Sequence, residues 1–429
     1  MADAAKLPLQ PWMAAPETAA VIAALTAKGA EVRFVGGCVR DAAIGRPVTD
    51  IDIATHDRPE TVTELLRAAR LKVVPTGIKH GTVTAVVKGH HFEITTLRRD
   101  VETFGRHARV EFTDDWAADA ARRDFTMNAM FLGVDGALYD PFGGLADLMA
   151  GRVRFVGDAR QRIREDVLRL LRFFRFHARY GRGAPDAEGL AACRALAHLL
   201  PTLSAERVRD ETLKLLRAPA PAEVLRLMAR EHILAQFLPE ARRFERLATL
   251  SQLPPEREAA DGLRRLAAAL DVDGAGARAV GERLRFSNRE IKRLGEILER
   301  LPGFVPLTDE CARRRWLYAH GAALYADLLL LYWAAKIGPD AKPGAAFLAS
   351  LKAELDAAAS WQRPALPVKG PDVMALGVAR GPKVGRLLKQ VEDWWIDGDF
   401  RARRDEALGE LRKLAGAPPA KKPKRRKQG

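Results

Sequence analysis

Two short motifs near the start of the chain combine residue types suited to phosphate and metal chemistry. In the first, an apolar run ending at Val35 is followed by Gly36 and Gly37, and Arg40 comes three residues later. Glycines lack a Cβ atom, so the backbone at these positions can approach a polyphosphate closely. Arg40 should lie in the turn that follows, where its guanidinium can hold phosphate oxygens. This segment therefore predicts a polyphosphate-binding turn.

The second motif is Asp50-Ile51-Asp52. Residues two apart on a strand point to the same face, so the carboxylates of Asp50 and Asp52 should lie together. Two carboxylates on one face can hold Mg²⁺, which normally takes substrate phosphates as further ligands. Together the two motifs indicate a site that transfers a phosphoryl or nucleotidyl group.

The elements around these motifs predict an α+β fold. Short β-rich runs alternate with helical patterns over roughly residues 25 to 145, which predicts a small mixed sheet with helices. The later part of the chain is rich in Leu, Ala, Arg and Glu at helical spacing, broken by Pro and Gly, so it should be helical. The expected parts are a catalytic head over 1–150, a helical neck over 151–220, a helical body and tail over 221–415, and a disordered basic end over 416–429.

The composition restricts the partners and the compartment. The 429 residues carry a formal net charge of +15, and the chain stays basic without the run at 421–427, which favours a polyanion such as nucleic acid or a membrane surface. The three cysteines lie far apart and form no zinc-like cluster, which favours a reducing, cytoplasmic location. No apolar run reaches membrane-spanning length, so we expect no membrane partner, and nothing implies a protein partner.

The two motifs, in this order and spacing, resemble the signature of the nucleotidyltransferase superfamily. The form is that of class II tRNA nucleotidyltransferases (CCA-adding enzymes) and bacterial poly(A) polymerases. Three further runs match this form: one over residues 122–129, one beginning at Glu165 and Asp166, and a helical run over 206–216 that we expect to brace the neck. The resemblance covers about residues 32 to 216. It implies a palm-like head with a small mixed sheet, followed by a helical neck, body and tail.

The resemblance also implies roles for particular residues. Arg123 would contact the nucleotide, while Asp124 and Asn128 would organise the ribose and the floor of the site. Glu93, on a predicted strand, would complete the acidic cluster. The implied chemistry is two-metal transfer to the 3′ end of tRNA, with Mg²⁺ as cofactor, CTP and ATP as substrates, and pyrophosphate as leaving group.

Asp166 and Arg169 could read the base. On a helix, residues three apart are neighbours, so their side chains should adjoin. A carboxylate only accepts hydrogen bonds and a guanidinium only donates them. Cytosine and adenine each place an amino donor beside a ring-nitrogen acceptor, whereas uracil and guanine present the reverse order, so the pair fits C and A. Arg172 and Arg175 continue the row but rotate away around the helix, so they should serve phosphate or RNA.

Several functions are compatible with this set of predicted site residues. Addition of C, C and A to tRNA is favoured by the run over residues 76–84, which looks like the CCA-adding form. The alternatives are a poly(A) polymerase, toward which the basic end points, and an enzyme that adds only CC or only A. An RNA-binding protein without catalysis is disfavoured, because Asp50, Asp52, Arg123, Asp166 and Arg169 are all in place.

Overall fold

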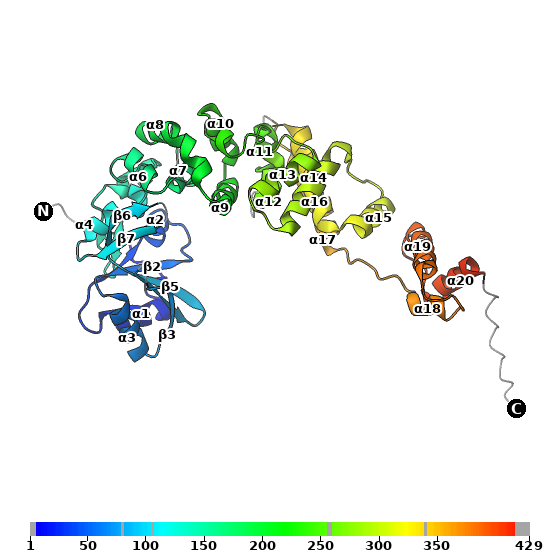
Figure 1. The fold of residues 1–429 in the computed structure, drawn as a ribbon, viewed down its shortest axis with the longest axis horizontal. Helices are drawn as coiled ribbons and strands as arrows, with labels where there is room; N and C mark the ends of the chain where they lie inside the picture. The colour runs from blue at the N-terminus through cyan, green and yellow to red at the C-terminus, as the bar shows by residue number, and fades with distance from the viewer. Residues whose placement is uncertain (1–5, 79–80, 105–106, 255–259, 339–340, 417–429) are drawn as a thin grey trace.

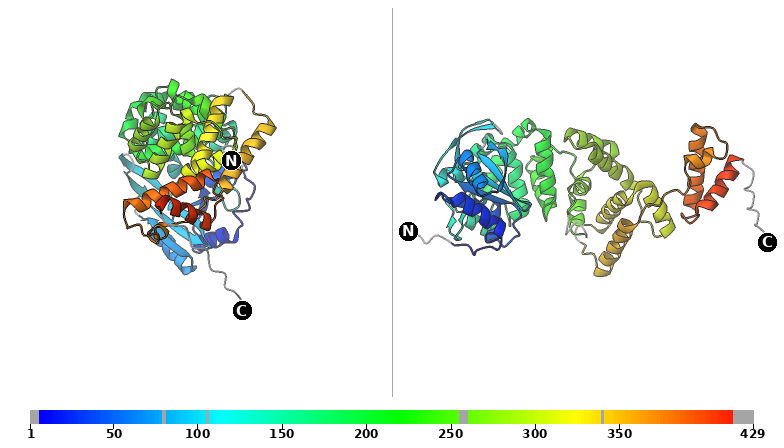
Figure 2. Two further views of the ribbon diagram at one scale, coloured as in Figure 1. Left: turned by 90° about the vertical axis from the view of Figure 1, so that its right-hand side faces the viewer. Right: turned by 90° about the horizontal axis from the view of Figure 1, so that it is seen from below.

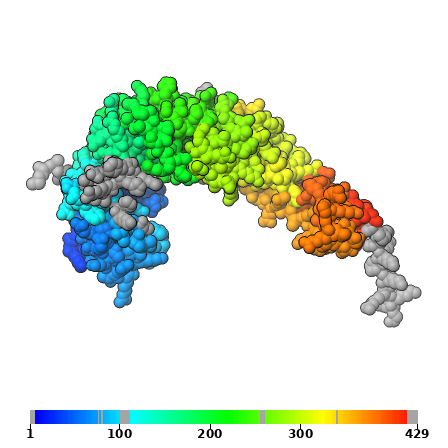
Figure 3. Space-filling model, viewed as in Figure 1, coloured from blue at the N-terminus to red at the C-terminus, as the bar shows by residue number. Residues whose placement is uncertain are grey.

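The structure is a computed structural model that describes residues 6–78, 81–104, 107–254, 260–338 and 341–416. The molecule is an elongated arch (Figure 1, Figure 3). One end of the arch holds every β-strand of these residues, and helices form the rest. The α+β class and the order of sheet first and helices second, both expected from the sequence, are confirmed.

Seven strands form one mixed sheet in the order β3-β4-β5-β2-β1-β8-β9, and β6 pairs with β7 in a separate hairpin. Strands β2 and β5 are parallel, and the other neighbours pair antiparallel. The strands are β1 (Val32–Val35), β2 (Ile51–Thr55), β3 (Lys72–Gly77), β4 (Thr82–Val87), β5 (His90–Thr96), β6 (Arg98–Phe104), β7 (His107–Phe112), β8 (Phe131–Gly133) and β9 (Leu138–Tyr139).

Successive side chains on the central strands point to opposite faces of the sheet, and both faces are apolar. Phe34 and Ile53 belong to the cluster that also contains residues of α1 (Pro16–Thr26) and α3 (Pro59–Ala68). The next residue on each strand, Val35 and Ala54, packs on the opposite side with Trp116 at the start of α4 (Trp116–Ala121). Because Asp52 is two residues from Ala54, its carboxylate lies on this second face, away from α1 and α3.

The first of the remaining helices contacts β1 and β2 in the head, and the later ones lead away from the sheet along the arch (Figure 1). Their bounds are α2 (Gly37–Ala43), α5 (Gly144–Ala150), α6 (Ala159–Glu165), α7 (Leu168–Tyr180), α8 (Ala187–Leu196), α9 (Ala205–Leu216), α10 (Pro221–Arg230), α11 (Phe244–Leu250), α12 (Gly262–Ala269), α13 (Gly274–Arg283), α14 (Asn288–Arg300), α15 (Glu310–His320), α16 (Ala322–Ile337), α17 (Ala345–Ser360), α18 (Gly370–Met374), α19 (Pro382–Asp397) and α20 (Arg404–Ala415). Short 3₁₀ turns intervene, among them Thr126–Asn128 in the head. None of the described helices is long and apolar enough to cross a bilayer.

Two hydrophobic clusters divide the helical part. One runs without a break from the head to α17, whereas α18, α19 and α20 enclose a small cluster of their own. These three helices stand apart from the body at the end of the arch (Figure 2). The segment predicted as one body and tail over 221–415 thus contains two packing units. The predicted disordered end over 416–429 lies outside the described residues except for Gly416.

Candidate active site

The turn between β1 and α2 has a backbone that only glycine fits well. Gly36 has φ +75°, the left-handed region that disfavours side chains. A Cβ atom there would lie 3.4 Å from Arg123 Nη1 and 3.9 Å from Asp52 Oδ2. The glycine therefore lets the backbone pass between a cation and a carboxylate, as expected for a site that receives a charged ligand.

Arg40 does not lie in that turn, as the sequence suggested, but inside α2. The helix begins at Gly37, directly after the turn, so Arg40 is already on its first full turn and only 8% exposed. Its Nη1 donates to Asn128 Oδ1 at 2.6 Å, and its Nε and Nη2 donate to Asp41. The Tyr180 hydroxyl also donates to Asp41, at 2.8 Å. Arg40 borders the pocket, but most of its donors hold the protein together.

The acidic residues gather around the start of β2. Asp52 and Glu93 are direct partners in the parallel pairing of β2 and β5, so their side chains share a face. Asp50 immediately precedes β2 and is exposed. Burial, followed by the nearby Glu93 and Asp50 carboxylates, raises the pKa of Asp52 to about 6, although Arg123 and Arg40 oppose the shift. Among the described residues, no three acidic, histidine or cysteine side chains are close enough to hold an ion by themselves.

The run after α4 supplies the floor of the site. The buried Asp119 accepts from Arg122 Nε at 2.7 Å and from Arg123 Nη2 at 2.9 Å. This carboxylate aims the Arg123 guanidinium, whose Nη1 faces Gly36.

Asp124 is the buried centre of this floor. Asn128 Nδ2 donates to its Oδ1 at 2.9 Å, and Arg172 Nε donates to its Oδ2 at 2.7 Å. Burial alone would raise the pKa of Asp124, but Arg172 and Asn128 hold it below its usual value. The predicted floor residues are thus linked in one chain of charged and polar groups.

The predicted pairing of Asp166 with Arg169 is wrong for this structure. Asp166 ends α6 with an extended backbone (φ −148°, ψ 105°) and precedes α7, so helical spacing does not apply between the two residues. Arg169 Nη1 donates to Glu165 Oε2 at 2.6 Å, and its Nη2 donates to the Arg122 carbonyl at 3.2 Å. The Asp166 carboxylate instead accepts from Arg207 on α9.

The same break in the helix corrects the expectation for the later arginines. Arg172 lines the pocket together with Asp166 and Arg169, so it does not turn away from them. Arg175 does face elsewhere: it pairs with Glu211 and joins α7 to α9. Asp166 is not part of α7, so the angular drift along a helix does not give its direction relative to Arg172 and Arg175.

All these segments meet at one open pocket of about 520 Å³. Ten predicted residues line it, whereas Asp50, Glu93 and Arg175 do not. The lining consists of Gly36, Gly37, Arg40, Asp52, Arg122, Arg123, Asp124, Asn128, Asp166, Leu168, Arg169, Arg172, Phe176 and Arg207.

Sequence reasoning did not assign Arg122, Leu168, Phe176 and Arg207 to the site. Arg207 is the most consequential omission. The sequence predicts the run that contains it only as a brace of the neck. Its spacing along α9 could not show that it reaches a residue 41 positions earlier.

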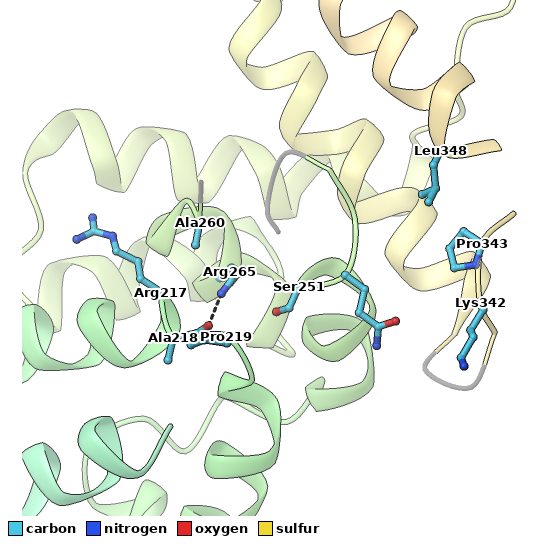
Figure 4. A pocket seen from close by; sticks show the side chains of 10 residues that line it. Arg217, Ala218, Pro219, Ser251, Ala260, Arg265, Lys342, Pro343 and Leu348 are labelled. Atoms are coloured by element: carbon cyan, nitrogen blue, oxygen red, sulfur yellow. Dashed lines mark hydrogen bonds between the residues drawn. The ribbon is translucent and has the colours of Figure 1, made fainter. Parts of the chain in front are cut away.

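A second cavity lies in the helical body, about 650 Å³ in volume (Figure 4). Arg217, Arg265 and Lys342 line it, and Arg265 Nη1 donates to the Ala218 carbonyl at 2.7 Å. None of the described residues that line it carries a carboxylate, the group that metal-assisted transfer needs and that the pocket at Asp52 has.

Comparisons with known proteins agree with this geometry. A family profile described as "Poly A polymerase head domain" matches residues 32–154, and one described as "Probable RNA and SrmB- binding site of polymerase A" matches residues 185–244. The mitochondrial CCA tRNA nucleotidyltransferase 1 of Danio rerio is 36% identical over 399 residues, covering 89% of this chain and 87% of the relative. The CCA-adding enzyme of Geobacillus stearothermophilus is 41% identical over 226 residues, covering 52% of this chain and 54% of the relative.

Solved structures agree as well. The CCA-adding enzyme of Bacillus stearothermophilus in complex with CTP superimposes with a TM-score of 0.78 at 29% identity, covering 95% of this chain and 98% of that one. The Thermotoga maritima CCA-adding enzyme complexed with tRNA has a TM-score of 0.60 at 21% identity, covering 95% and 96%, and shares the fold. The head profile matches residues 32–154, and the Danio rerio relative matches over most of both chains. The chain therefore belongs to the family of CCA-adding tRNA nucleotidyltransferases and poly(A) polymerases.

Proposed function

We propose that this protein completes the 3′ end of tRNA by adding C, C and A from CTP and ATP without a nucleic-acid template, releasing pyrophosphate. One observation carries the proposal. The pocket that contains Asp52 and the Gly36 turn also contains Asp166 and Arg169, so the groups for transfer and for reading a base share one cavity. The Danio rerio relative, similar over most of both chains, is named for this activity.

Mg²⁺ is the proposed cofactor, held by Asp50 and Asp52 with Glu93 assisting. The donor set fits, because Mg²⁺ prefers carboxylate oxygens and completes its shell with substrate phosphates. Burial, together with the nearby Glu93 and Asp50 carboxylates, raises the pKa of Asp52, and a bound cation would relieve this crowding of negative charge. When bound, the metal would activate the 3′-hydroxyl of tRNA and offset charge on the departing pyrophosphate.

The protein's own residues bind and orient the substrates. The backbone at Gly36 and Gly37, with Arg123 beside it, receives the triphosphate. Asp124 and Asn128 form the buried floor on which the ribose rests. Asp166 accepts a hydrogen bond from the amino group of C or A, and Arg169, held in place by Glu165, donates to the adjacent ring nitrogen. Positioning and electrostatics, rather than covalent chemistry, supply the protein's share of the acceleration.

Poly(A) polymerase activity is the second candidate, because the matching head profile carries that description. The two activities share the pocket and differ in the substrate end and in the use of CTP. An enzyme that adds only CC or only A would also share it.

We also propose a cytoplasmic location, consistent with the three free cysteines. Cell fractionation tests this location, since the Danio rerio relative is named as mitochondrial.

The decisive experiment uses tRNA that ends before CCA. It is incubated with Mg²⁺ and each nucleoside triphosphate separately and then with CTP and ATP together, and product length is read on a gel. Addition of two residues with CTP alone and three with both supports the proposal. Long tails with ATP alone would replace it with poly(A) synthesis. Arrest after two residues, or addition only to ends that already carry CC, would indicate a partial CC- or A-adding enzyme.

A further inference from the structure

Arg207 is a pocket residue to which the proposed chemistry gives no role. It lies on α9, while Asp166 lies at the junction of α6 and α7. Its Nη2 donates to both carboxylate oxygens of Asp166, at 3.0 Å to Oδ1 and 2.8 Å to Oδ2. The two side chains are 25% and 23% exposed, so the contact is only partly open to water.

The hydrogen bonds to Asp166 leave little of its carboxylate free. An ionised carboxylate offers about four acceptor positions, two on each oxygen. The backbone N–H of Leu168 donates to Oδ1 at 3.1 Å, so Oδ1 accepts both this bond and one from Arg207. Oδ2 accepts only from Arg207 among the described residues. One acceptor position therefore remains, on Oδ2, and a base amino group needs one.

Two ion pairs of opposite polarity fix α9 against the base-reading segment. Arg207 and Glu211 are four residues apart, so they share one face of α9. Arg207 holds the Asp166 carboxylate, and one turn later the buried Glu211 holds Arg175 of α7. A shift of α9 by one turn would set like charges against each other. This arrangement makes the position of Asp166 depend on α9.

We propose that Arg207 is a positioning residue for base selection. It fixes the Asp166 carboxylate so that Oδ2 alone faces the incoming base, and it keeps that acceptor in place when the base presents a carbonyl instead of an amino group. Uracil or guanine then meets acceptor against acceptor and is rejected. Without Arg207, the carboxylate can rotate aside and the wrong base is tolerated. This inference rests on the proposed function.

The test measures kcat/KM for CTP against UTP on tRNA that lacks CCA, and for ATP against GTP on tRNA that ends in CC. Arg207→Ala should lower both ratios about tenfold, the size expected for losing one hydrogen bond to a charged group. Arg207→Lys should restore part of the loss, because an ammonium also donates to a carboxylate. In an Asp166→Ala background, Arg207→Ala should lower the ratios no further.

Glu211→Gln is the matched control, because it weakens the neighbouring contact between α7 and α9 without touching the pocket. It should lower thermal stability and change both ratios much less than Arg207→Ala does, because Asp166 keeps its direct contact with Arg207. Unchanged ratios in Arg207→Ala, or an equal fall for all four nucleotides, would overturn the inference in favour of a purely structural role. If Arg207→Ala does not fold, Arg207→Gln carries the same test with the same two overturning results. A wild-type protein that incorporates neither C nor A would instead refute the proposed function.

Discussion

The transfer pocket and the terminal helices α18–α20 use the same charged residue types in different ways. In the pocket, ion pairs join distant segments: Asp124 pairs with Arg172 and Asp166 with Arg207, across 48 and 41 positions. In α20, Lys413 pairs with Glu410 of the same helix turn. An exposed pair of this kind joins no separate segments. A pair between segments fixes where a carboxylate sits, which is what selection of a substrate requires.

Long-range pairs occur at the terminal helices too, as where Arg404 of α20 pairs with Asp372 of α18. Arg314 of α15 donates to both oxygens of Asp399, at 2.8 and 2.7 Å, and ties the separate terminal cluster to the body. Tyr318 adds a hydroxyl bond to Glu392 at 2.7 Å. Ion pairs between distant segments therefore mark the places where two parts of the chain are held in a fixed relative position. A high content of basic residues does not mark such places by itself.

The largest effect should come from the acidic end of the pocket. Asp52→Ala should reduce incorporation by about 10³-fold or more, because metal stabilisation of the transition state is worth several kcal/mol. Binding of tRNA should stay nearly normal, since Asp52 faces the pocket floor and carries no positive charge. Single-turnover assays and a filter-binding measurement test both statements. Near-normal turnover would refute the metal assignment.

The next effect concerns selectivity. Asp166→Ala should relax CTP over UTP and ATP over GTP together, because C and A present the same edge to one carboxylate. Sites whose polar groups pair only with the right substrate discriminate by about 10⁴-fold, so the loss should be easy to measure. Ratios of incorporation on properly ending tRNA provide the readout. Unchanged ratios would move base selection elsewhere on the protein or onto the RNA.

Arg172→Ala should have an intermediate effect of another kind. Arg172 lines the pocket but its bonds hold Asp124, not Asp166, so incorporation of all four nucleotides should fall without loss of selectivity. Asp124 would be left buried without its cation, which should cost about 3 kcal/mol of the free energy of unfolding.

Lys413→Ala is the control in the terminal helices. It breaks an exposed pair within one helix and should cost less than about 1 kcal/mol. Chemical denaturation of Arg172→Ala and Lys413→Ala measures the loss in the free energy of unfolding for each. Equal losses would contradict the distinction between the pocket and the terminal helices.

The sequence predicted the parts that depend on local pattern. The small mixed sheet expected over roughly residues 25 to 145 is present, and ten predicted residues line the pocket. The prediction from sequence failed at the break between α6 and α7, because that break changes the directions of the side chains that follow it. Asp166 and Arg169 both line the pocket, but the break in the helix at Asp166 leaves their side chains paired with other residues.

The partners of the site residues could not be predicted either. That Asp166 meets Arg207, and that Arg40 is enclosed by Asn128 and Asp41, depends on how α2, α7 and α9 pack. Helical spacing gives the face of a residue but not the element opposite to it. The sequence therefore predicts which residues line the pocket better than it predicts the pairs that they form.

The smallest effect should come from removing residues 417–429, which lie outside the described residues. Six cations between 421 and 427 can attract RNA from a distance, but screened charges steer a ligand more than they orient it. The truncated protein should bind tRNA more weakly at low salt, approach the full chain at high salt, and react at the same single-turnover rate when tRNA is saturating. Binding measured across a salt series should give a shallower slope for the truncated chain, with each lost phosphate contact removing about 0.7 to 0.9 from it. A slower single-turnover rate would instead place this segment with the pocket, among the parts that orient the substrate.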